Sequence, residues 1–259
     1  MRFVQARNYT RGRTSSIDVL VIHTMENKES PDSAENIASW FAGSSAPEAS
    51  AHYCIDANSV IQCVRDEDVA WHAPGANHDG IGFEHAGTAR QTGRDWEDEF
   101  SRAMLARSAE LVAEKCAQYK IPPVWLYPPD LQAGRRGITS HNNVSKAFGR
   151  STHWDPGEGF NVQRYLRLVR KNLRERGKEV PPGNDLKPNP PTVGRKDSGW
   201  RVKSVQRRLA YHGFDPGTTD GDFGPRTEEA VKSFQKSRDL DVDGVVGPMT
   251  WKALNQPKS

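Results

Sequence analysis

The stretch IDVLVIH, residues 17–23, decides the fold of the first part of the chain. It is a nearly continuous apolar run that ends in a histidine, which is typical of a strand buried on both faces of a sheet. Helical and extended patterns alternate after it, with a helix expected over 32–41, a hairpin over 51–63 and a strand over 80–84. We therefore predict an α/β domain with a mixed central sheet flanked by helices.

Two further helices complete this predicted domain. Apolar residues at helical spacing indicate a long helix over 100–119 and a closing amphipathic helix around 162–173. The outer face of the closing helix is basic, and we interpret it as a solvated surface.

A proline-rich stretch over residues 177–199 separates this domain from the tail. Because proline fixes φ and has no N–H donor, the connection is expected to be extended and semi-rigid. The predicted parts are a domain over 1–178, a linker over 179–196 and a small domain over 197–259.

The tail contains an internal repeat. DGDFGPRTEEAV at 220–231 and DGVVGPMTWKAL at 243–254 share the pattern D-G-x-x-G-P-x-T-x-x-A-V/L. Glycine permits the positive φ of a turn, and proline suits the first position of a helix. A helical pattern before the repeats ends at Gly213, so the tail is predicted to be a small three-helix bundle.

Charge and hydropathy exclude two classes of function. The net charge is only +3, and residues 195–259 hold this excess with 12 Lys/Arg against 9 Asp/Glu. Such a weak, unclustered excess predicts no nucleic-acid partner. No apolar run approaches about 20 residues, so no membrane insertion is expected. The N-terminus lacks the apolar segment of a secretory signal peptide, which predicts synthesis in a cytoplasm without export.

The number and spacing of the three cysteines do not indicate a set of disulfide bonds. Pairing Ile55 with Val60 in the hairpin would leave Cys54 and Cys63 not directly opposed. Neither they nor Cys116 show the C-x-x-C spacing of a zinc knuckle. We expect reduced, partly buried thiols.

Eight histidines are scattered along the chain, and most histidines in proteins are structural or exposed. The context of three of them is unusual. His23 ends the buried strand, His141 follows the short strand GITS, and His153 lies with Asp155 in the turn-rich STHWDPGEGF. Two imidazoles and a carboxylate from separate strand ends could form a three-ligand zinc site with a fourth position open for water.

Six short motifs occur along the first domain in a fixed order. They are VIHT at 21–24, SAHY at 50–53, AWHA at 70–73, GIGFE at 80–84, GITSH at 137–141 and HWDPGEGF at 153–160. This set resembles the zinc-dependent N-acetylmuramoyl-L-alanine amidases of the phage-lysozyme and peptidoglycan-recognition-protein superfamily, over about residues 1–175. The tail, over about 197–254, resembles the helical peptidoglycan-binding module of cell-wall hydrolases.

The resemblance implies that His23, His141 and Asp155 hold Zn²⁺, with aspartate where some relatives have cysteine. It implies Glu84 as the base that takes a proton from zinc-activated water, because the tyrosine of other members is replaced by Ala51. Without the resemblance, Glu84 could equally be a charged residue at a strand end.

Further roles follow from the same resemblance. His153 replaces a lysine of many relatives and, when protonated, would stabilise the tetrahedral oxyanion. Trp71, His72 and Asn77 would line the substrate groove, although Trp71 could equally belong to the core. The remaining histidines are interpreted as structural or as exposed: His52 and His85 as structural, His78 and His212 as exposed.

The implied activity is hydrolysis of the amide bond between the lactyl group of N-acetylmuramic acid and L-alanine. Bacterial peptidoglycan is the expected partner, and a monomer is expected. A wall-binding tail without an export signal resembles a phage endolysin, which waits in the host cytoplasm until the membrane is permeabilised. Two alternatives remain: a non-catalytic peptidoglycan-binding protein and a cytoplasmic muropeptide-recycling amidase. The tail could also be a folding cap or a spacer.

Overall fold

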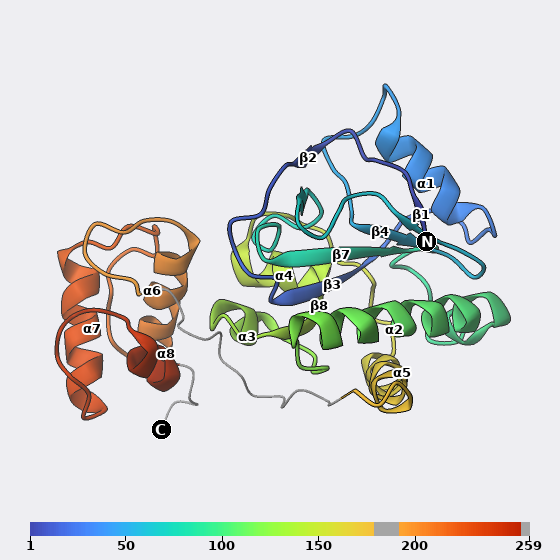
Figure 1. Cartoon of the computed structure of the whole chain (residues 1–259). Helices are drawn as coiled ribbons and strands as arrows, with labels where there is room; N and C mark the ends of the chain where they lie inside the picture. Colours follow the sequence, from blue (N-terminus) through green and yellow to red (C-terminus); the bar gives the residue numbers. More distant parts are fainter. Residues whose placement is uncertain (179–191, 255–259) are drawn as a thin grey trace. The chain divides into compact units, whose positions relative to one another are not determined.

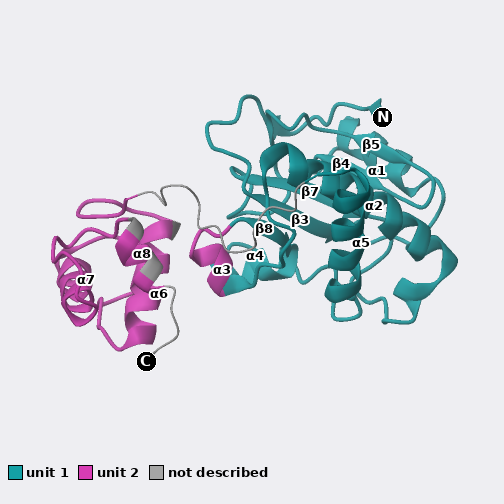
Figure 2. Ribbon diagram, turned by 60° about the horizontal axis from the view of Figure 1, so that its bottom comes forward, with its two compact units in different colours: residues 1–128, 136–184 teal, residues 129–135, 185–259 magenta. Residues whose placement is uncertain are grey.

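The computed structural model describes residues 1–178 and 192–254 of the chain. They form two compact units (Figure 2). Unit 1 contains Met1–Pro128 and continues from Arg136, whereas unit 2 contains Pro129–Arg135 and the described residues from 192 onward. Each unit has its own hydrophobic core.

The predicted linker falls largely outside the described residues, which omit 179–191. The division into 1–178, 179–196 and 197–259 therefore stays a prediction. Among the described helices, none is long and apolar enough to cross a lipid bilayer.

A six-stranded sheet forms the centre of unit 1 (Figure 1). In order across the sheet, its strands are β1 (Arg2–Phe3), β5 (Val60–Gln62), β4 (Tyr53–Ile55), β7 (Gly80–His85), β3 (Val19–Thr24) and β8 (Gly137–Ser140). The β4–β5 pair is antiparallel and the other neighbouring pairs are parallel. All six residues of β3 are buried, which confirms the interpretation of the run IDVLVIH. A separate antiparallel pair joins β2 (Tyr9–Thr10) to β6 (Val69–Ala70).

Helices cover both faces of the sheet, which confirms the predicted fold class (Figure 1). On one face α2 (Glu99–Tyr119) packs against α5 (Val162–Glu175), and both contribute to the main core. On the other face α1 (Ser33–Ala42) packs against β4 and β5. The shorter helices of unit 1 are η1 (Asp95–Glu97) and α4 (His141–Phe148), whereas α3 (Pro128–Gln132) belongs to unit 2 except for its first residue.

The hairpin of β4 and β5 has the predicted register, with Ile55 opposite Val60 and Cys54 opposite Ile61. Cys54 and Cys63 are therefore not directly opposed, yet their Sγ atoms lie 3.7 Å apart, because diagonal neighbours on one face of a sheet can touch. All three cysteines are free and fully buried, more deeply than expected. Cys54 and Cys63 are fully buried because α1 covers their face of the hairpin.

Three parallel strands bring their carboxyl ends to one edge of the sheet. His23 of β3 lies opposite Glu84 of β7, and Ile22 lies opposite Ser140, the last residue of β8. His141 follows directly as the first residue of α4. Ligand sites of open α/β sheets occur at the carboxyl ends of strands, so this edge is where chemistry is expected.

The tail contains the three predicted helices. Their core is built from apolar residues of every helix, including Val205, Leu209, Phe234 and Trp251. The helix α6 ends at Gly213 with φ of 90°, as expected for a glycine C-cap. The helices are α6 (Trp200–His212), α7 (Pro225–Ser237) and α8 (Pro248–Leu254).

Each repeat loop of the tail is bound by one buried glutamine that the sequence analysis did not single out. Gln206 donates to the aspartate and threonine of the first loop and accepts from a glycine N–H, and Gln235 makes the same three bonds in the second loop. The bonded residues are Asp220, Thr227 and Gly221 in the first loop and Asp243, Thr250 and Gly244 in the second.

The two histidines expected to be exposed differ in the structure. His78 is exposed. His212 is buried, so that expectation was wrong: it lies in the last turn of α6, and its Nε2 is 3.1 Å from the carbonyl oxygen of Leu254 at the end of α8.

Candidate active site

The three predicted ligands meet at the carboxyl edge of the sheet. His23 Nδ1 lies 3.1 Å from His141 Nδ1 and 3.3 Å from Asp155 Oδ2, and His141 Nδ1 lies 3.3 Å from Asp155 Oδ1. All three residues are buried, and among the described residues they form the group suited to hold a metal ion. Their distant sequence positions converge because two come from strand ends and one from the loop after α4.

Hydrogen bonds hold the loop that contains Asp155, and the start of α4, in place. The Asn142 N–H donates to the backbone oxygen of Asp155, and the Thr24 N–H donates to its Oδ2. Ser140 caps α4 by accepting a hydrogen bond from the Asn143 N–H, which fixes the backbone of the neighbouring His141. The ligand positions are thus set by backbone geometry.

Electrostatics favours an Asp155 carboxylate facing a neutral His23 ring. Burial alone would raise the pKa of Asp155, but hydrogen bonds from His141 and His23 outweigh it and lower the pKa. Burial lowers the pKa of His23 to about 4, so its ring is neutral at pH 7. A neutral imidazole and an ionised carboxylate are the protonation states that bind a metal.

The donor set and its spacing fit zinc. Two imidazole nitrogens and a carboxylate oxygen at about 2.0–2.1 Å from a tetrahedral ion would lie about 3.3 Å from one another. The two histidine Nδ1 atoms, 3.1 Å apart, are close to that spacing, and each lies 3.3 Å from a different oxygen of the Asp155 carboxylate. Three protein ligands leave a fourth position, as catalytic zinc sites require.

Glu84 lies beside the ligands, on the strand next to His23. Its Oε2 atom is buried and has no hydrogen-bond partner in the described part of the chain. Burial, with the negative charges of Asp155 and Glu26, raises the pKa of Glu84 well above its usual range. A carboxyl with a raised pKa and a free oxygen is suited to accept and return a proton.

His153 lies at the outer side of the ligand cluster. Its ring stacks on the ring of His141 with centroids 4.5 Å apart and planes at 8°. Its Nδ1 is 3.9 Å from Asp155 Oδ1, and 64% of the side chain is exposed. The ring is therefore accessible both to solvent and to a molecule in the groove.

The structure places the three predicted groove residues in different surroundings. Trp71 is 37% exposed and lines the groove, and its indole N–H donates to Thr10 Oγ1. His72 also lines the groove but is only 6% exposed. Asn77 does not line it: its Oδ1 accepts from the N–H groups of His72 and Ala73 and so shapes the loop beneath.

The groove has a volume of about 370 Å³ and holds the ligand cluster, Glu84 and His153. One wall comes from α1, with Ile37, Trp40 and Phe41, which the sequence analysis treated only as members of a helical pattern. The indole of Trp40 is 48% exposed there. An exposed tryptophan on an otherwise amphipathic helix is the signal that could have found this wall.

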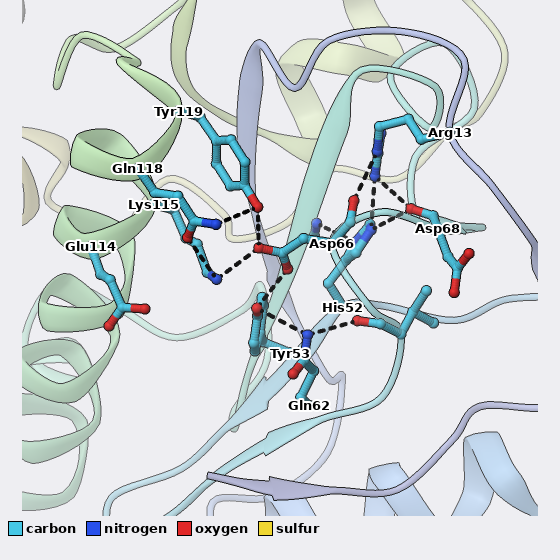
Figure 3. A network of polar contacts seen from close by, with 12 residues as sticks. Arg13, His52, Tyr53, Gln62, Asp66, Asp68, Glu114, Lys115, Gln118 and Tyr119 are labelled. Atoms are coloured by element: carbon cyan, nitrogen blue, oxygen red, sulfur yellow. Dashed lines mark hydrogen bonds and ion pairs between the residues drawn. The ribbon is translucent and has the colours of Figure 1, made fainter.

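A network of polar contacts connects the loop after β5 to α2 and to Arg13 (Figure 3). Asp66 accepts hydrogen bonds from Lys115, Tyr53 and Tyr119, so the loop after β5 is tied to α2. Arg13 donates to the backbone oxygen of Asp66, and its guanidinium lies 3.0 Å from His52 Nε2.

His52 and His85 have the structural surroundings that were expected of them. His52 Nδ1 accepts from the Gly82 N–H, and the ring is fully buried. His85 is also fully buried, with Nδ1 2.9 Å from the carbonyl oxygen of His23 and Nε2 2.6 Å from Ser108 Oγ. Both rings hold strand β7 in position beside the ligands.

Three residues that could hold a metal ion, at a groove that also contains a carboxyl group with one buried oxygen, are the arrangement of a metal-dependent hydrolase. Residues 13–158 match the family described as N-acetylmuramoyl-L-alanine amidase, and residues 198–254 match a family of peptidoglycan binding domains. The chain therefore belongs to the N-acetylmuramoyl-L-alanine amidases, enzymes that hydrolyse an amide bond of peptidoglycan.

Individual relatives agree with this assignment. The chain is 28% identical over 277 residues to the "Probable N-acetylmuramoyl-L-alanine amidase" of Bacillus licheniformis, covering 98% of this chain and 71% of the relative. It is 31% identical over 170 residues to N-acetylmuramoyl-L-alanine amidase A of Achromobacter lyticus, covering 62% of this chain and 88% of the relative. The solved structure of Staphylococcus aureus hydrolase AmiA in complex with its ligand shares the fold, with a TM-score of 0.52 and 20% identity over 69% of this chain and 85% of that chain.

Proposed function

We propose that this amidase uses a zinc ion held by His23, His141 and Asp155 to cleave the bond between the lactyl group of N-acetylmuramic acid and L-alanine. The observation that supports this most directly is the convergence of two histidine Nδ1 atoms, 3.1 Å apart and each 3.3 Å from an oxygen of the Asp155 carboxylate, at the groove that also contains Glu84. An unactivated amide needs both a strong nucleophile and stabilisation of the developing oxyanion, and the groove holds groups for each.

The chain's own residues divide this chemistry. A bound zinc ion would lower the pKa of water to about 7 and polarise the amide carbonyl. Glu84, with its free buried oxygen, takes the proton from water and returns it to the leaving amine. His153, exposed and stacked on His141, donates to the oxyanion when protonated. Trp71 offers an exposed ring for the substrate.

The experiment that tests this function is digestion of purified peptidoglycan followed by mass spectrometry. A free lactyl carboxylate and new N-terminal alanine are the expected products. New reducing sugar ends without new alanine termini would identify a glycosidase and refute the proposal.

Removing one ligand tests the role of the metal. We expect His141→Ala to lose bound zinc and measurable hydrolysis together, because two protein ligands do not form a catalytic zinc site. Elemental analysis of the purified variant and of the unchanged protein measures the metal. Full hydrolysis by a zinc-free variant would show that the ion is not used.

We further propose that the protein acts as an endolysin, reaching the bacterial wall from the cytoplasm after the membrane is permeabilised. The support is the pairing of an amidase domain with a tail that matches peptidoglycan-binding domains. Tethering raises the local concentration of a polymeric substrate without any change in the catalytic groove.

Deleting residues 179–259 tests the tether. Hydrolysis of soluble muropeptides is expected to stay within about twofold, whereas hydrolysis of intact walls should fall by about tenfold or more. Rates on both substrates and the circular dichroism of the truncated protein are the measurements. Equal losses on the two substrates would contradict the tether.

A further inference from the structure

His72 makes its closest polar side-chain contact with a metal ligand. It lies in the loop after β6, and its Nδ1 is 3.1 Å from Nε2 of His23. The two rings meet edge to face, with centroids 5.2 Å apart and planes at 88°. Only 6% of His72 is exposed, so little of the side chain is available to a substrate.

The proton positions on the two rings follow from the ligand geometry. His23 directs Nδ1 toward His141 and Asp155, so that nitrogen must keep its lone pair for the ion. A neutral imidazole has one N–H, which then sits on Nε2 of His23 and donates to Nδ1 of His72. The proton of His72 is left on its own Nε2, a buried atom without a hydrogen-bond partner among the described residues.

The surroundings of His72 hold its ring in this place. A Cβ on Gly82 would lie 2.6 Å from Cγ of His72, and one on Gly80 would lie 3.2 Å from its Nε2. The two glycines of β7 therefore leave a recess that the ring occupies. The backbone N–H of His72 donates to Asn77 Oδ1, which fixes the loop on the other side.

We propose that His72 is a positioning residue, which accepts the Nε2 proton of His23 and thereby holds Nδ1 of that ligand toward the metal. The inference rests on the proposed metal site and goes beyond it. It assigns His72 to the outer shell of the ion and explains why residue 82 of the neighbouring strand is a glycine. Outer-shell partners of ligating histidines fix ring orientation, and their loss typically weakens metal binding by about 10–100-fold.

Two variants of similar size separate the acceptor from the bulk of the side chain. Asparagine places Oδ1 close to the position of Nδ1 and can accept the same proton, whereas leucine cannot. In the metal-free full chain, His72→Leu is expected to bind zinc about 10–100-fold more weakly than the unchanged protein. His72→Asn is expected to stay within about threefold of the unchanged protein, because the acceptor is kept.

Zinc affinity is measured by competition with a chromogenic chelator, and the melting temperature of each metal-free variant reports folding. Trp71→Leu is the matched control, because Trp71 lines the same groove but its indole N–H donates to Thr10. Its zinc affinity should equal that of the unchanged protein. If His72→Leu does not fold, Gly82→Ala makes the same comparison, since the added methyl group displaces an unaltered ring.

Two outcomes would overturn the inference: unchanged zinc affinity in His72→Leu (or in Gly82→Ala, where that variant replaces it), or equal weakening in His72→Asn and His72→Leu. Failure of the proposed function looks different, because the unchanged protein would then bind zinc without hydrolysing peptidoglycan, or would bind no zinc.

Discussion

Replacing Glu84 with glutamine is expected to lower the rate of peptidoglycan hydrolysis by about 10²–10⁴-fold while leaving the zinc content unchanged. Glutamine has nearly the same shape but cannot accept the proton of the attacking water. Glu84 belongs to strand β7 and is not one of the three residues whose ligand atoms converge. A large loss of rate without loss of metal is the combination that a general base should give.

The raised pKa of Glu84 gives this role a physical cause. Burial and the nearby carboxylates disfavour its charged form and raise its pKa. A carboxylate with a raised pKa is a stronger base toward the attacking water than a surface carboxylate is.

The control for this variant is Glu48→Gln. Glu48 lines the same groove but is exposed, so its replacement should change kcat by no more than a few-fold. Single-turnover rates on purified peptidoglycan, with elemental analysis of each protein, make the comparison. If Glu84→Gln keeps more than about a tenth of the rate, the base lies elsewhere and the assignment is wrong.

The fold could be predicted because its signals are local. The buried run before His23, the hairpin around residues 56–59 and the helical spacing of α2 and α5 each depend on neighbours in sequence. The placement of His23 and His141 followed from the same logic, whereas the full ligand set with Asp155 followed from the family resemblance. A polar residue at the end of a buried parallel strand must lie at the carboxyl edge of the sheet, where other strand ends converge.

What the sequence did not reveal depends on contacts between distant segments. The recess for His72 needs Gly80 and Gly82 on a neighbouring strand, and the bond to His23 spans 49 positions. The two glutamines of the tail bind loops whose pattern was recognised without their partners. The carboxylate of Asp66 is likewise shared by three side chains, two of which come from α2. The periodicity of apolar residues in the sequence indicates which face of a helix or strand is buried. It does not indicate which polar atoms form hydrogen bonds with one another.

The second large effect is expected on stability. The metal-free protein should lose about 4 kcal/mol of unfolding free energy between pH 7 and pH 5 through two histidines alone. Burial, then the charge of Arg13, lowers the pKa of His52 to about 3, and burial lowers the pKa of His85 to about 4. Unfolded histidines titrate near 6.5. Such a loss is a large share of a typical stability of about 5–15 kcal/mol.

The sign of this pH dependence follows from the difference in proton uptake between the unfolded and folded states. Between pH 6.5 and about 4 the unfolded chain binds protons at both positions and the folded chain does not, so acidification favours unfolding. Glu84 acts in the opposite direction, because its raised pKa lets the folded state bind a proton earlier. One such group offsets only part of the loss from two histidines, and the net slope stays positive with pH.

Urea unfolding followed by tryptophan fluorescence from pH 8 to pH 5, with a chelator present, measures this slope. In His85→Asn the amide can still donate to the carbonyl oxygen of His23, yet it does not titrate, so the slope should fall by about one proton. His78→Asn, at an exposed position, should leave the slope unchanged. A stability that stays flat between pH 7 and pH 5 would mean that the buried rings take up protons in the folded state, which the complete burial of both rings argues against.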